Sequence, residues 1–218
     1  EKELATGEGF LKKPLNLIDR KSVWERIQKA GLTEAEVGYL WMDDSLGLIL
    51  DKLDKLGIAD NTIVVFVSDH GSEKKGSLIK TRGTEIPCLI RWPKVIKPGS
   101  VSRGLLQNTD FVPTWFELAK AKIPKGYHID GKSLAPMFKD PAVSIRNYIY
   151  GEQGAARAIK TETFEYLSIR YTDEQITGAQ SKRADRAYKT LLGLSSGISR
   201  ARYFHPDIFS ADQLYDLS

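Results

Sequence analysis

Two side chains that bind metals well stand next to each other in this sequence. Asp69 and His70 come directly after an apolar run, and Gly71 follows them. A carboxylate and an imidazole side by side can each offer a lone pair to one cation, and a glycine lets the backbone turn sharply away from them. Because so short a motif is a weak signature, a second interpretation stays open, in which Asp69 caps a following helix and His70 is a surface residue.

Four basic residues follow in the same predicted loop: Lys74, Lys75, Lys80 and Arg82. A lysine beside a metal site can bind an anionic oxygen and stabilise negative charge that develops in a transition state. For any single one of these residues, an ordinary position in a solvated loop is the alternative. Their closeness to Asp69 and His70 favours a role in the same site.

The remaining histidines and the cysteine are weaker candidates. His128 and His205 lie in loop-like sequence without partners at metal-ligand spacing, so we expect them on the surface. Cys88 lies inside an apolar segment and is predicted to be a small buried hydrophobic residue. The sequence contains no glycine-rich phosphate loop, no zinc-binding HExxH motif and no nucleophile elbow.

The Asp69–His70 pair is preceded by a predicted helix and a predicted strand. Thr33 and Glu36 form a capping-box signature, and apolar residues then recur at helical spacing as far as Gly57. Residues 62–67 form a continuous apolar, β-branched run, as expected of a strand covered on both faces. A helix that leads into such a strand is typical of α/β folds, in which ligands bind beyond the carboxyl ends of the strands.

The pattern changes towards the end of the chain. A second strand is predicted at 86–91, and a helix from Asp110 to about Ala121 with Thr109 as its cap. From Arg146 onward, three short aromatic-rich segments predict antiparallel strands: 148–150, 155–159 and 164–171. A helix is expected somewhere between 172 and 200. We therefore predict an α/β part over residues 1–145 and a smaller antiparallel part over residues 146–218.

Composition and charge narrow the classes of protein to consider. The chain has 218 residues and a formal net charge of +4. Hydrophobic residues make up 41 % of the chain and charged residues 28 %. These are ordinary values for a globular protein and exclude a disordered chain. No apolar run approaches the roughly 18 residues that a membrane span needs. The basic residues are spread along the chain and lack interleaved aromatic residues, so nucleic acid is not an expected partner.

Five segments, taken in order, resemble one known family. They are 42–71, which includes NTIVVFVSDHG, then 82–93 (RGTEIPCLIRWP), 108–114 (NTDFVPT), 130–134 (DGKSL) and 213–217 (QLYDL). One such segment alone is weak, but the ordered set resembles formylglycine-dependent (type I) sulfatases of the alkaline phosphatase superfamily. The resemblance covers most of residues 38–218.

The resemblance implies a fold and a reaction. The fold would be part of an alkaline-phosphatase-like sheet covered by helices, followed by a smaller antiparallel subdomain. The reaction would be hydrolysis of a sulfate ester at a divalent cation, and sulfated carbohydrates are the expected substrates. Calcium is the expected cation, with magnesium and manganese as alternatives. The family implies a periplasmic, secreted or lysosomal location.

The family also implies roles for individual residues. Asp69 and His70 match two cation ligands, and Lys75, or Lys80 as the alternative, matches the lysine that contacts the sulfate. The family more often has Asn at the position of His70. A His there also occurs in related phosphodiester and phosphonate monoester hydrolases, so that reaction stays open, as does a non-catalytic module that binds sulfated glycans.

The family's nucleophile has no match in this chain. Sulfatases attack with a hydrated formylglycine made from a Cys or Ser in a Cys-x-Pro/Ala-x-Arg motif, and the residues after Cys88 do not fit it. The two other acidic cation ligands are missing as well. The chain also begins with Glu1 and carries no apolar leader. We therefore expect a C-terminal portion whose partner is the missing N-terminal half, and which alone is inactive and binds cations weakly.

Overall fold

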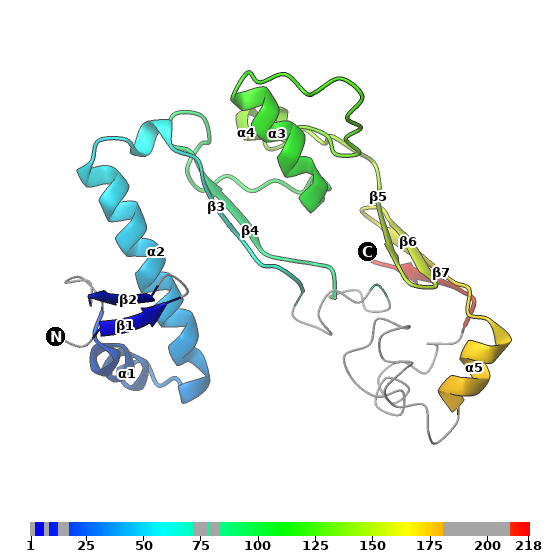
Figure 1. Ribbon diagram of the computed structural model, residues 1–218, viewed down its shortest axis with the longest axis horizontal. Helices are drawn as coiled ribbons and strands as arrows, with labels where there is room; N and C mark the ends of the chain where they lie inside the picture. Colours follow the sequence, from blue (N-terminus) through cyan, green and yellow to red (C-terminus); the bar gives the residue numbers. More distant parts are fainter. Residues whose placement is uncertain (1–2, 7–8, 13–17, 72–77, 79–82, 181–209) are drawn as a thin grey trace. The chain divides into compact units, whose positions relative to one another are not determined.

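The computed structural model describes residues 3–6, 9–12, 18–71, 78, 83–180 and 210–218 (Figure 1). Its strands are β1 (Glu3–Thr6), β2 (Gly9–Lys12), β3 (Val64–Val67), β4 (Cys88–Arg91), β5 (Ile149–Gln153), β6 (Ala156–Lys160), β7 (Phe164–Ile169) and β8 (Asp212–Asp216). Its α-helices are α1 (Arg20–Lys29), α2 (Val37–Lys55), α3 (Phe111–Leu118), α4 (Ala135–Lys139) and α5 (Asp173–Gln180). Short 3₁₀ helices are η1 (Glu34–Glu36), η2 (Ala59–Asn61) and η4 (Asn108–Asp110).

The chain divides into two compact units. The first comprises Glu1–Ile63 with Trp92–Lys94, and the second comprises Val64–Arg91 with Val95–Ser218. The mixture of helices and antiparallel sheets is consistent with the α/β class predicted from the sequence. The predicted boundary near residue 145 stays a prediction, although the four-stranded sheet of the second unit does begin at Ile149.

The first unit holds the hairpin β1–β2 and the helices α1 and α2. The predicted capping box is confirmed: the Thr33 hydroxyl accepts a hydrogen bond from the Ala35 N–H, and the Glu36 carboxylate accepts one from the Thr33 N–H at 2.7 Å. The helical segment closes at Gly57, which takes a left-handed φ of 68° that favours glycine. An ion pair between Arg26 and Asp44 joins α1 to α2.

The second unit begins with the antiparallel pair β3–β4. Val64 lies opposite Arg91, and Val67 lies opposite Cys88. Both predicted strands are thus confirmed, with shorter bounds. The strand β3 is less enclosed than its continuous apolar run predicts, because three of its residues are half-buried and Val67 is exposed. Among the described strands, β4 is the one that pairs with it.

The helix α3 departs from its prediction at both ends. It starts at Phe111 after the 3₁₀ turn η4 and stops at Leu118, short of Ala121. Thr109 is not the cap, so that prediction was wrong. The residue before the turn is Gln107, which forms a capping box with Asp110, and the Phe111 N–H donates to the Asn108 carbonyl within the turn.

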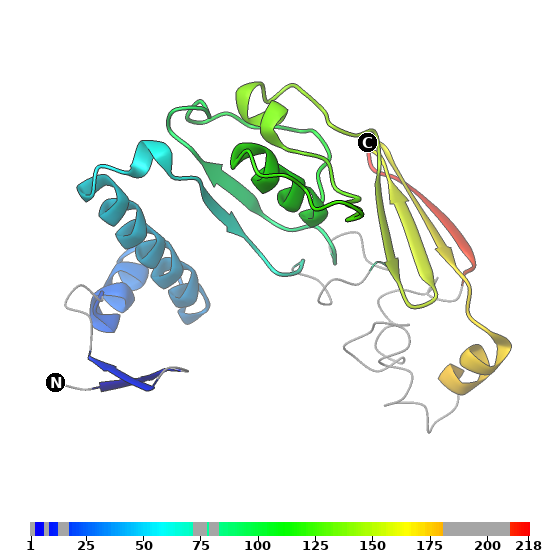
Figure 2. The same ribbon diagram turned by 45° about the horizontal axis from the view of Figure 1, so that its top comes forward.

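The last four strands form one antiparallel sheet in the order β5-β6-β7-β8 (Figure 2). The three strands predicted from alternating residues are confirmed, whereas β8 was not predicted as a strand. One face carries the buried residues Ala156, Ala158, Leu167 and Ile169. The helix α5 lies within the range 172–200 where a helix was expected, and residues 181–200 of that range lie outside the described residues.

Candidate functional site

A cavity of about 470 Å³ lies in the second unit. Its lining includes the end of β3 and the residues just after it, Leu78, the start of β4 and the residues before it, residues 106–109 and Phe111 around the turn η4, and residues of β5, β6 and β7. Six of the lining residues carry the chemistry considered below: Asp69, His70, Cys88, Gln107, Lys160 and Glu165. The predicted metal-binding pair therefore opens onto a cavity of the size that small-molecule sites have.

Backbone pairing continues beyond the end of β3 and fixes the position of the Asp69–His70 pair. The Ser68 N–H donates to the Pro87 carbonyl at 3.4 Å, and the Gly71 N–H donates to the Gly83 carbonyl at 3.0 Å. Gly71 is itself buried. The two candidate ligands thus lie on a short exit segment held at both ends, although neither belongs to the strand.

The side chains of the pair lie close to one another. The His70 Nε2 atom is 3.7 Å from the Asp69 Oδ1 atom, and the two side chains are 40 % and 86 % exposed. The His70 Nδ1 atom is 2.8 Å from the Gly71 carbonyl oxygen. Since a carbonyl oxygen only accepts hydrogen bonds, this contact places the proton on Nδ1 and leaves the Nε2 lone pair available to a cation.

This geometry fits two neighbouring ligands of one cation. Calcium lies about 2.3–2.6 Å from its ligands, so two ligands at right angles are about 3.4 Å apart. The observed separation of 3.7 Å between Nε2 and Oδ1 needs little adjustment. Within the described part of the chain, no group of three or more His, Cys, Asp and Glu side chains could hold a metal. Asp69 and His70 therefore fit as part of a ligand set.

The predicted sulfate-binding lysines are not tested by the structure. Lys75 and Lys80 lie outside the described residues. Leu78, which stands between them in the sequence, is described and buried, and it lines the cavity. Its N–H donates to the Gln153 side-chain oxygen at 3.2 Å, and a Cβ atom added to Gly151 would lie 2.8 Å from its Cδ2 atom.

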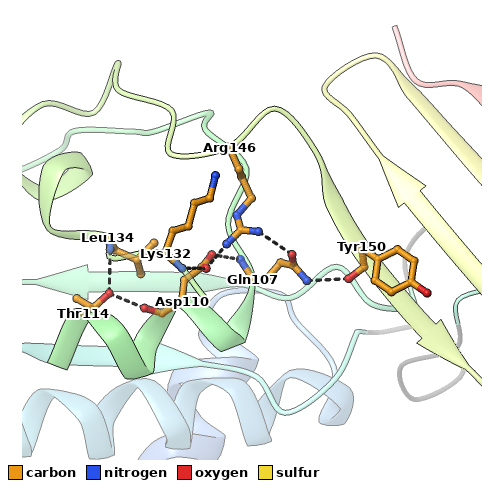
Figure 3. Close-up of polar contacts among 7 residues, drawn as sticks. All are labelled: Gln107, Asp110, Thr114, Lys132, Leu134, Arg146 and Tyr150. Carbon is orange, nitrogen blue, oxygen red and sulfur yellow. Dashed lines mark hydrogen bonds and ion pairs between the residues drawn. The ribbon is translucent and has the colours of Figure 1, made fainter. Parts of the chain in front are cut away.

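A buried polar network, missed from the sequence, supports one wall of the cavity (Figure 3). The Asp110 side chain is 0 % exposed. Its carboxylate accepts hydrogen bonds from the Gln107 N–H at 2.7 Å, the Lys132 N–H at 2.8 Å and the Arg146 guanidinium. Arg146 also donates to the Gln107 side-chain oxygen at 2.9 Å, and the Gln107 amide donates to the Tyr150 carbonyl at 2.8 Å. The network thus links the turn η4 to the strand β5.

The network extends to the segment that precedes α4. The Thr114 hydroxyl donates to the Asp110 carbonyl and accepts from the Leu134 N–H at 2.8 Å (Figure 3). A Cβ atom on Gly131 would lie 2.0 Å from the Thr109 carbonyl oxygen, so only glycine allows this close backbone approach. Segments 108–114 and 130–134, which the sequence singled out, are therefore held together by buried polar contacts.

Lys160 and Glu165 are two further cavity residues that sequence reasoning missed. They lie directly opposite each other on β6 and β7. The Lys160 Nζ atom lies 3.8 Å from the Glu85 Oε1 atom. Glu165 is 6 % exposed, and burial raises the pKa of its carboxyl, with Glu85 adding to the rise and Lys160 opposing it. The available signal was a charged residue on the face of the strand that alternation predicts to be buried.

The weaker candidates behave largely as surface residues. His128 lies 3.0 Å from the Asp130 carboxylate in a pair whose side chains are both more than four-fifths exposed. His205 lies outside the described residues. Cys88 is half-buried rather than buried, it lines the cavity, and burial raises the pKa of its thiol.

The segment that carries Asp69 and His70 also matches a known family. The family model described as Sulfatase matches residues 38–121. An ulvan-active sulfatase of Formosa agariphila is 38 % identical over 119 residues, which are 55 % of this chain and 23 % of that protein. Over residues 38–121, the chain is therefore similar to the sulfatase family.

Two further comparisons show the same similarity. An N-acetylglucosamine-6-O-sulfatase of Bacteroides thetaiotaomicron is 36 % identical over 108 residues, which are 46 % of this chain and 19 % of that sulfatase. A solved structure described as a complex with its substrate D-glucosamine-2-N,6-O-disulfate has a TM-score of 0.51 and 27 % identity, and the match covers 70 % of this chain and 37 % of that one. The matches thus span about a fifth of the curated sulfatases' length.

Two observations bear on the remaining expectations from the sequence. A solved structure described as a complex with k-i-k-neocarrahexaose has a TM-score of 0.57 at 23 % identity, and the match, which covers 81 % of this chain and 45 % of that one, shows a similar fold. Among the described helices, none combines the length and the apolar character needed to cross a membrane.

Proposed function

We propose that this chain forms part of an enzyme that hydrolyses sulfate esters of carbohydrates. The observation that carries the proposal is the Asp69–His70 pair, which lies within the family match and opens onto the cavity. Relatives named for ulvan and for N-acetylglucosamine-6-sulfate support a carbohydrate substrate. A non-catalytic module that binds glycans would not need a metal-binding pair in the segment that follows β3.

In this proposal, Asp69 and His70 hold a divalent cation, with calcium as the first choice. When bound, such a cation polarises the sulfate oxygens and offsets negative charge in the transition state. The hydrogen bond from His70 Nδ1 to the Gly71 carbonyl orients the imidazole, so that Nε2 keeps its lone pair on the side of Asp69. Lys75 or Lys80 binds the sulfate group.

The attacking group belongs to a different part of the enzyme in this proposal. The Cys-x-Pro/Ala-x-Arg motif is absent from the 218 residues, so the formylglycine nucleophile and the other acidic ligands come from outside them. The residues described here then contribute half of the cation site and one side of the substrate cavity. The chain alone is expected to bind calcium weakly and to turn over no substrate.

Paired ester substrates test the reaction. The protein expressed from its full reading frame should release sulfate from N-acetylglucosamine-6-sulfate and stop when a chelator removes the cation. Faster turnover of a phosphodiester or phosphonate monoester would favour the related hydrolases, in which a His also occurs at the position of His70. Binding of sulfated glycans without turnover of any ester would favour the non-catalytic module.

A further inference from the structure

The lining that β6 and β7 give to the cavity contains an unusual pair of charged residues. Lys160 and Glu165 are direct cross-strand neighbours, and opposite charges so placed normally attract each other. Within the described residues, however, the ion pair of Lys160 is with Glu85, at 3.8 Å. Glu165 therefore has the expected partner beside it without forming an ion pair with it.

Among the described residues, one carboxyl oxygen of Glu165 finds no hydrogen-bond partner. The residue is 94 % buried, and its Oε2 atom has no hydrogen-bond partner among the described residues. A buried carboxyl oxygen without a partner lowers the stability of the folded state. Such groups are uncommon, and an unpaired group that lines a cavity is explained most simply by a partner that enters the cavity.

The rest of this wall indicates the kind of group that would enter. Ile149 and Ala158 line the cavity beside Lys160 and Glu165, so an apolar patch adjoins two hydrogen-bonding groups. The charge of Lys160 is offset by Glu85, so the wall does not favour a second anion. A ring that has C–H faces and hydroxyl groups matches both features, since a hydroxyl can donate to one side chain and accept from another.

We propose that Glu165 and Lys160 contact the sugar ring of the sulfate ester and thereby determine which alcohol the enzyme accepts. This inference rests on the proposed function. It adds that the sulfate lies at the Asp69–His70 end of the cavity and that a ring hydroxyl hydrogen bonds to the Glu165 carboxyl. Lys160 donates to the same or a neighbouring hydroxyl while it keeps its ion pair with Glu85.

Two substrates separate a sugar-contacting role from a structural one. N-acetylglucosamine-6-sulfate carries the ring, whereas 4-nitrophenyl sulfate carries the same ester group on a phenol without hydroxyl groups on a sugar. In the protein from the full reading frame, Glu165→Leu should lower kcat/KM for the sugar sulfate about tenfold, the effect of one hydrogen bond, mainly through KM. Turnover of the aryl sulfate should stay within about twofold.

Further variants check the reason for that loss. Glu165→Gln keeps a donor and an acceptor and should recover most of the sugar selectivity, whereas Lys160→Met should lower it. Glu162→Leu, at an exposed position in the turn between β6 and β7, is the matched control and should change neither substrate. Equal losses on both substrates, or an unchanged ratio in Glu165→Leu, would overturn the inference.

Failure of the proposed function gives a different result. If the wild-type protein turns over neither sulfate ester, that proposal fails, and calorimetric titration with N-acetylglucosamine-6-sulfate still tests the wall. Binding that weakens about tenfold in Glu165→Leu and not in Glu162→Leu supports the inference. Equal binding by the two variants, or no binding by the wild type, contradicts it.

Discussion

The second unit contains two buried carboxyl groups in opposite situations. Asp110 accepts hydrogen bonds from two backbone N–H groups and from the Arg146 guanidinium. Glu165 is almost as buried, yet its Oε2 atom has no partner among the described residues. The two buried carboxyl groups therefore differ in the completeness of their hydrogen bonding among the described residues, and not in their burial.

The two carboxyl groups also stand in different relations to the cavity. Asp110 does not line it, but it holds Gln107, which does, and Gln107 in turn bonds to the backbone of Tyr150 in β5. Glu165 faces the cavity directly. The Asp110 network thus supports the wall, whereas Glu165 lines the cavity with an Oε2 atom that has no hydrogen-bond partner in the described part of the chain.

Removal of the Asp110 carboxylate should have the largest effect on stability. Asp110→Ala leaves the buried Arg146 guanidinium without its counter-charge, and breaking a buried pair costs about 3–5 kcal/mol. Denaturant unfolding measures the loss. The control Asp130→Ala breaks an exposed pair with His128 and should change stability little. Similar losses in the two variants would remove the contrast between Asp110 and other acidic residues.

The close backbone approach at Gly131 should give the next largest effect. In Gly131→Ala, the added methyl group would overlap the Thr109 carbonyl. Such overpacking lowers the free energy of unfolding by about 1–3 kcal/mol. Gly47→Ala is the matched control, because a Cβ atom at this position in α2 meets nothing within 4 Å. That control should raise stability by about 0.5–1 kcal/mol. If both variants melt at the wild-type temperature, segments 108–114 and 130–134 are not packed as described.

The smallest effect concerns the pH dependence of stability, which Glu165 should influence. Because burial raises the pKa of Glu165, the folded protein keeps this proton to higher pH than the unfolded chain does. Its contribution is therefore full below the ordinary pKa and is lost as pH rises through the raised one. Glu165→Gln cannot ionise, so the melting temperature of this variant should rise relative to that of the wild type as pH increases above the ordinary pKa of a glutamate carboxyl. Parallel curves would contradict an elevated pKa.

The local features of the fold could be predicted from the sequence, and the tertiary ones could not. The Thr33–Glu36 capping box and the strands β3 and β4 depend on neighbouring residues, so their patterns sufficed. The cap of η4 depends instead on the Asp110 side chain, whose competing partners come from distant segments. Thr109 was the better cap on sequence grounds alone, and tertiary contacts overrode that preference.

The candidate site divides in the same way. Asp69 and His70 could be found because they follow an obvious strand, and the structure places both on the cavity. Glu165 could not be found in this way. A single glutamate in an alternating strand is not notable until the structure shows that its Oε2 atom has no hydrogen-bond partner among the described residues. Helix periodicity also predicted an apolar face on α2, yet Met42 and Ile49 are exposed, since periodicity does not say what covers a face.

The central claim is that Asp69 and His70 hold the cation at which a sulfate ester is hydrolysed. Calcium-dependent release of sulfate from N-acetylglucosamine-6-sulfate by the protein from the full reading frame tests it most directly. We predict that Asp69→Asn and His70→Ala each lower kcat/KM at least about 100-fold at limiting calcium, because loss of even an outer-shell partner of a metal costs about 10–100-fold. His128→Ala should keep wild-type activity, and turnover within about twofold of wild type in either ligand variant would contradict the claim.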